Sequence, residues 1–307
     1  MATDVTVPGM LRRQLTPLEP LVARLESARG LDTPGRLVGR TVRGVLVPGQ
    51  FKQALSGTWL GHALHPLLTD LVIGSFVSAS LLDVIGGDQA GIASERLIAV
   101  GIAAYGPTAL TGVSDWADSE AVDDGVRRTG LVHATSNAVA LTLYSASLAA
   151  RRRGARREGA LFGAAGATAL MAAGYLGGHL SYSAGVGPNQ TVFDPGSAAW
   201  TAAAPVAQLV DRRPTRVVVG DTPVLLFRDG DLTYAIHDRC SHRGCSLSDG
   251  KLDGRQIVCA CHGSQFDLQT GALRRGPATS AQPAFEVRER DGALEVRRLP
   301  PRSAPLG

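Results

Sequence analysis

The fold of this chain is decided by two short segments near the C-terminus, C-S-H-R-G-C over residues 240–245 and C-A-C-H-G-S over residues 259–264. Each segment carries one cysteine and one histidine at close spacing: Cys240 with His242, and Cys259 with His262. The sequence has only 4 cysteines and all lie in these segments, so no disulfide scaffold extends through the rest of the chain. We therefore expect a metal centre held between two loops.

The mixed ligand set favours an iron–sulfur cluster. A [2Fe–2S] cluster with two cysteines on one iron and two histidines on the other is the Rieske arrangement. Neutral imidazoles make the oxidised cluster less negative, so it accepts an electron more easily. Zinc is the alternative, but such zinc sites usually place both cysteines before both histidines, whereas here each segment carries one of each.

The pattern C-x-H-x-G-C with C-x-C-H-G-S resembles the Rieske proteins of quinol-oxidising cytochrome complexes. The resemblance implies four ligands and a disulfide: Cys240 and Cys259 on one iron, His242 and His262 on the other, and Cys245 bonded to Cys261.

The same resemblance implies four positions that tune or cover the cluster. Ser264 falls where a hydroxyl donates to a bridging sulfide and raises the reduction potential. Phe266 stands where the high-potential members have Tyr, so we expect a potential below the top of the roughly −150 to +300 mV Rieske range. Gly276 and Pro277 begin a G-P-A segment that resembles the proline loop covering the cluster.

The middle of the chain reads as a membrane domain over residues 59–184. Its four apolar segments are each near the ~20 residues that a spanning helix needs, and lie at residues 63–85, 92–113, 131–150 and 160–180. Small residues are abundant, as expected where membrane helices pack closely. A soluble bundle would show polar helix faces, but the last two segments contain no acidic or basic residue.

The remaining segments complete a two-part prediction. Residues 1–58 are expected to be a basic segment with a short amphipathic helix, lying on the membrane or packed on the next domain. Residues 185–209 read as a linker, and strand and hairpin signals follow over residues 210–300. The predicted fold is α+β: an N-terminal four-helix transmembrane bundle and a small C-terminal antiparallel β domain.

The membrane segment also resembles a known family. W-L-G-H-A-L-H-P-L-L-T-D-L, G-L-V-H-A-T-S-N and G-Y-L-G-G-H-L are similar to a bacterial membrane family of unknown function that often precedes a Rieske domain. This implies a multi-pass protein of the bacterial cytoplasmic membrane, with the lipid bilayer as a partner.

Four antiparallel spans would gather polar residues at one membrane face: His62, His65, Asp70, His133, Asn137 and His179. Ionisable groups in spans are functional candidates, and helix bundles commonly host haem. These residues form a possible site for haem b, with His133 paired to His179 or to His65, or for a quinone. The alternative is a set of hydrogen-bonded structural histidines.

The distribution of basic residues predicts which side of the membrane each part of the chain occupies. The run at residues 151–157 carries five arginines, so the positive-inside rule places it in the cytoplasm and the Rieske domain outside. A disulfide between the loops agrees with an oxidising compartment, although the first fifteen residues contain no apolar signal region. The net charge of +4 comes without a basic-aromatic platform, so no nucleic-acid partner is expected.

These features predict one-electron transfer between a membrane donor, quinol or haem, and a redox partner. The alternative is a redox sensor or assembly factor in which the membrane part is only an anchor. The large subunit of a ring-hydroxylating oxygenase is not expected, because its mononuclear iron needs two histidines and a carboxylate. Outside the cluster segments, the C-terminal part offers only His237.

Overall fold

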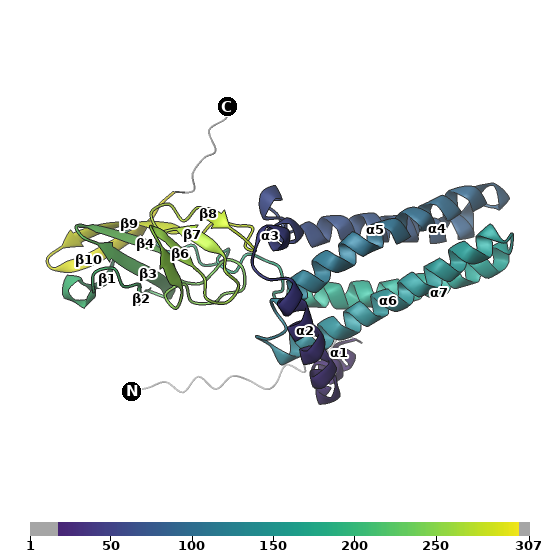
Figure 1. The fold of residues 1–307 in the computed structure, drawn as a ribbon, viewed down its shortest axis with the longest axis horizontal. Coiled ribbons are helices and arrows are strands. Elements are labelled where there is room, and N and C mark those ends of the chain that lie inside the picture. The colour runs from purple at the N-terminus through teal and green to yellow at the C-terminus, as the bar shows by residue number, and fades with distance from the viewer. Residues whose placement is uncertain (1–17, 301–307) are drawn as a thin grey trace, which may run out of the picture.

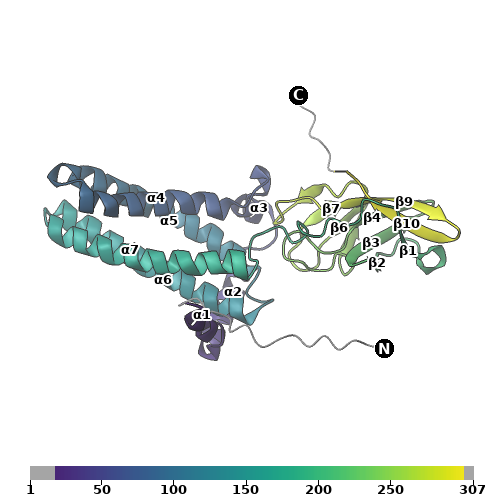
Figure 2. The same cartoon turned by 180° about the vertical axis from the view of Figure 1, so that it is seen from behind.

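The computed structural model describes residues 18–300 and shows two parts placed end to end (Figure 1). One part is helical and the other is a β domain, and the view from behind shows the same arrangement (Figure 2). The tip of the β domain faces one end of the helical part.

Within the described residues, the helical part has seven α-helices and several shorter helical turns: α1 Glu19–Glu26, η1 Arg29–Leu31, α2 Asp32–Val45, α3 Gln50–Ser56, η2 Thr58–Leu60, α4 Leu64–Ile85, η3 Asp88–Ala90, α5 Gly91–Ala117, α6 Asp124–Arg152, α7 Arg156–Gly178 and η4 His179–Ser183. Helices α4–α7 correspond to the four expected spans. Among the described residues, three helices are long and apolar enough to cross a membrane, over Leu64–Ile85, Gly91–Ala117 and Arg156–Ser183.

The helix α6 is not among these three, so the four-span count remains a prediction. Its expected apolar stretch at residues 131–150 contains His133, Asn137 and several hydroxyl side chains. Arg127 and Arg128 also belong to the helix and lower its hydropathy further.

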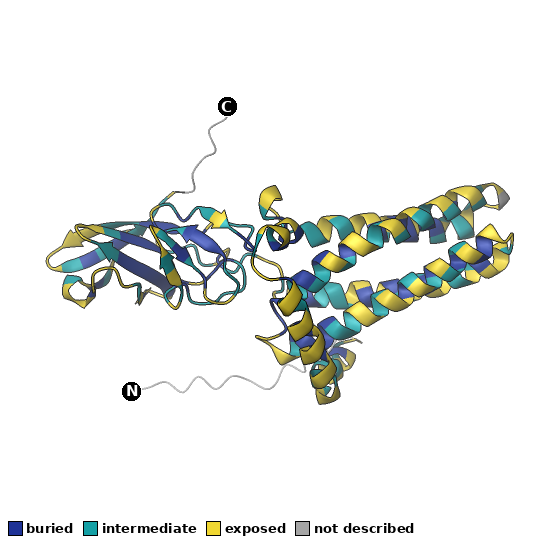
Figure 3. Cartoon of the chain, viewed as in Figure 1, coloured by how far each residue is buried: buried dark blue, intermediate teal, exposed yellow. Residues whose placement is uncertain are grey.

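The long helices form two hairpins, α4 with α5 and α6 with α7, which lie side by side (Figures 1 and 2). Their shared core lies in the middle of the helices and includes Val72, Ala140 and Leu170. Phe76 and Tyr144 stack in it with ring centroids 3.9 Å apart. Exposed residues run along the outer faces of the hairpins (Figure 3). Many of the exposed residues are large and apolar, such as Leu81 and Leu161. Such a surface suits contact with lipid.

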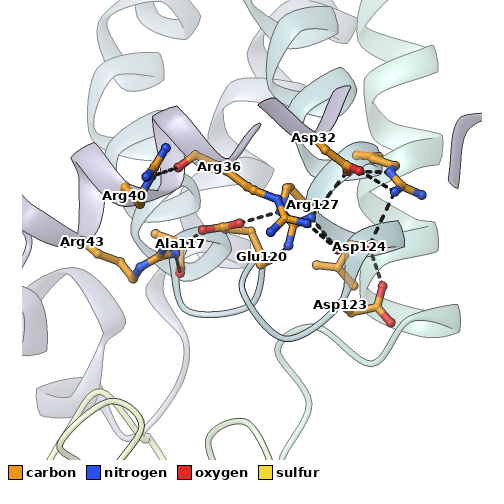
Figure 4. Close-up of polar contacts among 11 residues, drawn as sticks. Asp32, Arg36, Arg40, Arg43, Ala117, Glu120, Asp123, Asp124 and Arg127 are labelled. Carbon is orange, nitrogen blue, oxygen red and sulfur yellow. Dashed lines mark hydrogen bonds and ion pairs between the residues drawn. The ribbon is translucent and has the colours of Figure 1, made fainter. Parts of the chain in front are cut away.

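The described part of the N-terminal segment, residues 18–58, differs from the expectation because it contains three α-helices instead of one. The expected amphipathic helix is α1, which packs on α6 through the buried Val22 and leaves Leu18 and Leu21 exposed. Ion pairs fasten α2 to the junction of α5 and α6 (Figure 4), where Arg43 of α2 donates to Glu120 and Asp32 of α2 accepts from Arg128. Residues 1–17 of the predicted segment lie outside the described residues.

The β domain contains two antiparallel sheets. The six-stranded sheet has the order β1-β10-β9-β4-β3-β2 and the four-stranded sheet the order β5-β6-β7-β8. The strands are β1 Thr201–Pro205, β2 Thr215–Val219, β3 Thr222–Asp229, β4 Leu232–His237, β5 Lys251–Asp253, β6 Gln256–Val258, β7 Gln265–Asp267, β8 Leu273–Arg275, β9 Ala284–Arg290 and β10 Ala293–Arg298. β1 falls inside the expected linker at 185–209 and pairs with β10, so the β domain begins earlier than predicted. β1 consists mainly of alanines and ends at Pro205, residues that favour strands weakly, so its sequence did not indicate a strand.

Candidate iron–sulfur centre

Two loops of the same construction form the tip of the β domain. In the first, the backbone N–H of Cys240 donates to the carbonyl of Cys245 and Gly244 donates back to Cys240, each over 2.8 Å. In the second loop, Cys259 donates to Ser264 over 2.8 Å and Gly263 donates to Cys259 over 3.0 Å. Gly244 and Gly263 have φ angles of 76° and 77°, a conformation that glycine adopts without strain. The glycine in each motif therefore closes its loop.

The two loops are joined by the Cys245–Cys261 disulfide, as the resemblance implied. Cys240 and Cys259 are free, buried and close enough to share a hydrogen bond. This hydrogen bond and burial raise the pKa of the Cys240 thiol. The same hydrogen bond outweighs burial at Cys259 and lowers its pKa to about 7. The pair is thus placed for two sulfur ligands, with Cys259 the more readily ionised.

The two histidines lie beside each other at the same tip. The rings of His242 and His262 are 5.1 Å apart between centroids and nearly perpendicular, at 84°. Burial is the main cause that lowers the pKa of both imidazoles, which favours the neutral form that binds metals. Nδ1 of His242 is buried without a hydrogen-bond partner, as expected for an atom that would bind iron.

The sulfur atoms of Cys245, Cys259 and Cys261 lie within 4.8 Å of one another, which alone would resemble a three-cysteine site. The disulfide removes two of these sulfurs from consideration, because a thiolate is the ligand form of cysteine. The available donors are therefore two thiols and two imidazoles, the set that a [2Fe–2S] cluster of the mixed type requires.

The predicted tuning residues surround this centre. Ser264 is buried, and its Oγ accepts a 2.9 Å hydrogen bond from the N–H of Ala278, which leaves its own O–H free to donate. Phe266 is buried in the core beneath the loops, paired with Ile257 of the neighbouring strand. Gly276 and Pro277, joined by a cis peptide bond, are buried at the start of the loop that runs over the tip.

Comparison with known proteins supports this interpretation. The family described as "Rieske [2Fe-2S] domain" matches residues 199–286, and the family described as "Predicted membrane protein (DUF2231)" matches residues 61–190. The chain is 32% identical over 99 residues to the anthranilate 1,2-dioxygenase ferredoxin subunit of Burkholderia cepacia, covering 32% of this chain and 92% of that protein. The chain belongs to the Rieske [2Fe-2S] family.

Two further relatives are ferredoxins as well. Ferredoxin CarAc of Metapseudomonas resinovorans is 41% identical over 85 residues, covering 28% of this chain and 78% of that protein. A solved structure, the ferredoxin of carbazole 1,9a-dioxygenase from Nocardioides aromaticivorans IC177, is 31% identical with a TM-score of 0.31 and covers 32% of this chain and 97% of that chain. The Rieske domain thus implies a [2Fe–2S] cluster and has electron-transfer ferredoxins as homologues.

The tip of the Rieske domain contacts the helical part, which the sequence did not predict. His242 Nε2 lies 3.6 Å from a carboxylate oxygen of Asp118, and the other oxygen of Asp118 binds Lys52 Nζ at 2.7 Å. Arg243 donates to the carbonyl of Asp115 over 3.2 Å, and Thr58 donates to the carbonyl of Ala278 over 3.1 Å. No local sequence signal links these groups, because their partners lie far apart in the chain.

The membrane residues proposed for haem or quinone are only partly brought together. His62 and Asp70 are exposed, and Nε2 of His179 donates to the carboxylate of Glu26 of α1 over 2.8 Å. Nε2 of His133 instead lies 3.1 Å from the amide of Asn137. The pairing of His133 with His179 is not formed, whereas His65 and His133 remain half-buried on facing hairpins.

Proposed function

We propose that the four side chains at the tip ligate the [2Fe–2S] cluster and that the protein is a membrane-bound one-electron carrier. The thiolates would hold one iron and the imidazoles the other: Cys240 with Cys259, and His242 with His262. When bound, a Rieske cluster takes up and releases a single electron. The donor or acceptor on the membrane side would be a quinol or a haem, and a redox partner would complete the transfer.

The observation that supports this function best is the contact between the tip and the helical part. A ligand histidine directs Nε2 toward Asp118, and its neighbour Arg243 binds the end of α5. Thr58 holds the loop that covers the centre. The edge of the proposed cluster site therefore lies against the membrane domain, so electrons would pass through this contact.

The chain's own residues keep the site rigid and dry. The disulfide joins the two ligand loops, while Ser264 fixes the covering loop through Ala278. Leu247 and Phe266 close the floor of the centre. A rigid, water-poor site reduces the rearrangement that accompanies a change of charge, which suits rapid electron exchange.

Ligand substitution tests the assignment. In protein purified in mild detergent and reduced with dithionite, Cys259→Ser or His262→Cys should abolish the Rieske electron paramagnetic resonance (EPR) signal. His62→Ala is the matched control, because it removes an exposed histidine outside the tip and should keep the signal. A Rieske signal that survives either ligand substitution refutes the assignment.

We further propose that the Rieske domain lies outside the cytoplasm. The arginines of residues 151–157 lie at the turn between α6 and α7, the end of the helical part remote from the β domain. Arginines at both ends are paired with carboxylates, such as Arg127 with Glu120 at the near end and Arg151 with Asp83 at the remote end. The disulfide supports the same side. An alkaline phosphatase fused to the C-terminus should be active, and an inactive but intact fusion would contradict this orientation.

A further inference from the structure

Two histidines of the membrane domain occupy equivalent positions in the two hairpins. The ring of His65 on α4 lies against Gly112 of α5, and the ring of His133 on α6 lies against Gly177 of α7. A Cβ added at Gly112 would be 2.6 Å from the His65 ring, and one added at Gly177 would be 2.9 Å from the His133 ring. Each glycine therefore makes room for an imidazole on the preceding helix.

The hydrogen bonds of the two rings are equivalent as well. His65 Nδ1 lies 3.0 Å from the carbonyl of Thr108, and His133 Nδ1 lies 2.8 Å from the carbonyl of Ala173. Each carbonyl belongs to the residue four positions before the facing glycine. Because a carbonyl only accepts, Nδ1 carries the hydrogen in both rings, and each Nε2 keeps a lone pair. This is the orientation in which proteins hold metal-ligating histidines.

The two rings lie at a level of the bundle where the apolar core has ended. Each of the two histidines and their two facing glycines, Gly112 and Gly177, stands seven residues from a residue of the apolar core, which is about two helical turns or ~10 Å. The four core residues are Val72, Tyr105, Ala140 and Leu170. On α5 three of the buried positions toward the histidine end are polar, Thr108, Thr111 and Ser114, and the small Ala117 follows them. Ser114 Oγ is buried without a partner. Buried polar groups inside a membrane bundle indicate a binding site.

From this arrangement we infer that His65 and His133 are the axial ligands of a b-type haem held between the two hairpins. The two histidines stand on the faces of α4 and α6 that meet across the hairpins, because Phe76 and Tyr144, each eleven residues further along the same helices, stack with ring centroids 3.9 Å apart. Two histidines alone do not complete a bare metal site, and among the described residues no group of three His, Cys, Asp or Glu side chains in the helical part is placed to hold an ion. A tetrapyrrole supplies the remaining four iron ligands itself. Iron binding would displace the Asn137 amide from Nε2 of His133.

The location of this site connects it to the Rieske tip. Asp115 follows Gly112 by one turn of α5 and accepts a hydrogen bond from Arg243, the residue after His242. The same helix thus borders both the inferred haem and the proposed cluster. The inference rests on the proposed electron-transfer function, since it supplies the haem left open there as the membrane partner.

Haem titration tests the inference directly. The full chain, purified in detergent with its cluster, is titrated with haemin and followed by visible and EPR spectroscopy. We expect one haem per chain with a six-coordinate, low-spin spectrum. His65→Ala and His133→Ala should each convert the haem to a high-spin form and weaken binding about tenfold or more, whereas His62→Ala, at an exposed histidine of the same end, should behave as wild type. In His65→Gly and His133→Gly, added imidazole should restore the low-spin spectrum if the lost group was a ligand.

The outcomes separate the two proposals, because the Rieske EPR signal is recorded on the same samples. A full cluster signal with no haem bound overturns the haem site and leaves the electron carrier standing. Unchanged low-spin spectra in both alanine variants would also overturn it, as would binding of a quinone analogue in a wild type that takes no haem. The cluster signal of the Cys259→Ser and His262→Cys variants tests only the proposed function and leaves the haem site undecided by itself, so the two proposals fail independently.

Discussion

Phe266 stands on β7, in the floor of the centre, where its ring carries no hydroxyl to direct at the cluster sulfurs. Phe266→Tyr would add that donor without changing the size of the buried ring greatly. Because a hydrogen bond to sulfur stabilises the reduced, more negative cluster, the variant should have a higher reduction potential than wild type. A redox titration followed by EPR measures it, with Phe227→Tyr, a buried ring elsewhere in the same core, as the control. An equal or lower potential in Phe266→Tyr contradicts the role assigned to this position.

His237 gives the Rieske domain a pH dependence that lies in an accessible range. It is fully buried, and burial, the largest cause, outweighs the hydrogen bond to Asp194 and lowers its pKa below 6.5. The unfolded chain therefore binds this proton more readily than the folded domain. Stability is fully present above pH ~6.5 and declines as the pH falls toward the folded pKa.

Thermal unfolding of the domain, measured from about pH 8 to about pH 5.5, should show this decline. His237→Asn cannot ionise and should flatten the slope over that interval, whatever its own stability. A wild-type slope that persists unchanged in the variant would assign the effect to another group.

At the residue scale, the sequence predicted residues that belong to a recognisable motif and missed residues whose role depends on which distant side chains they contact. The structure contains the predicted disulfide between Cys245 and Cys261. It could be predicted because the motif that carries the two cysteines is specific. Lys52 and Asp118 form a buried ion pair across 66 positions, and neither stands in a motif. His62 and His65 both stand at the start of the first apolar segment, yet only His65 packs against α5, while His62 is exposed.

At the scale of elements, the two ligand loops behave as a single unit because the disulfide joins them across 16 positions. The double variant Cys245→Ser with Cys261→Ser frees those loops in the unfolded state and should lower the unfolding free energy by about 3 kcal/mol. Denaturant unfolding of the Rieske domain measures the loss. An unfolding free energy equal to that of wild type under non-reducing conditions would show that the bond is not stabilising.

Long periodic elements were predictable, and short irregular ones were not. The helices α4, α5 and α7 match the expected spans because continuous apolar stretches of that length have few other structures. The helix α2 was missed because Pro34, Gly35 and Gly39 weaken its helical signal. Its glycines face Arg127 and Glu120 closely, so a tertiary contact explains residues that look unfavourable in isolation.

At the scale of the whole molecule, a buried ion pair lies beneath the contact between the two parts. Lys52 and Asp118 are each only 3% or less exposed, and Asp118 also faces His242. Lys52→Met would leave a buried carboxylate without its partner and should destabilise the protein by about 3–5 kcal/mol. Adding Asp118→Asn should recover much of that loss, because the uncompensated charge is gone. Denaturant unfolding in detergent compares the double variant with the two single variants, Lys52→Met and Asp118→Asn, and additive losses in the double variant would contradict direct pairing.

The sequence predicted the two parts of the molecule but not how they meet. Motifs and hydropathy describe short stretches of sequence, so they indicated an apolar helical part followed by a β domain. The contact depends on single side chains from α3, η2 and the end of α5 that converge on the tip. Side chains that come together from separate elements leave no repeating pattern in the sequence, so this contact could not be predicted.

The docking of the Rieske tip on its own membrane domain is the central claim, and a designed crosslink tests it most directly. A Cβ at Gly276 would lie 3.0 Å from the Cβ of Thr58, slightly less than the ~3.5–4.5 Å between the Cβ atoms of a disulfide, so a small outward shift of the loop allows the bond to form. Thr58→Cys with Gly276→Cys is oxidised in a chain carrying a protease site at Gly185, then cut and run on a non-reducing gel. The matched control pairs Gly276→Cys with Trp59→Cys, because Trp59 is exposed. We predict that the two halves stay linked only in the Thr58 pair; halves that separate as readily as in the control would contradict the docked arrangement.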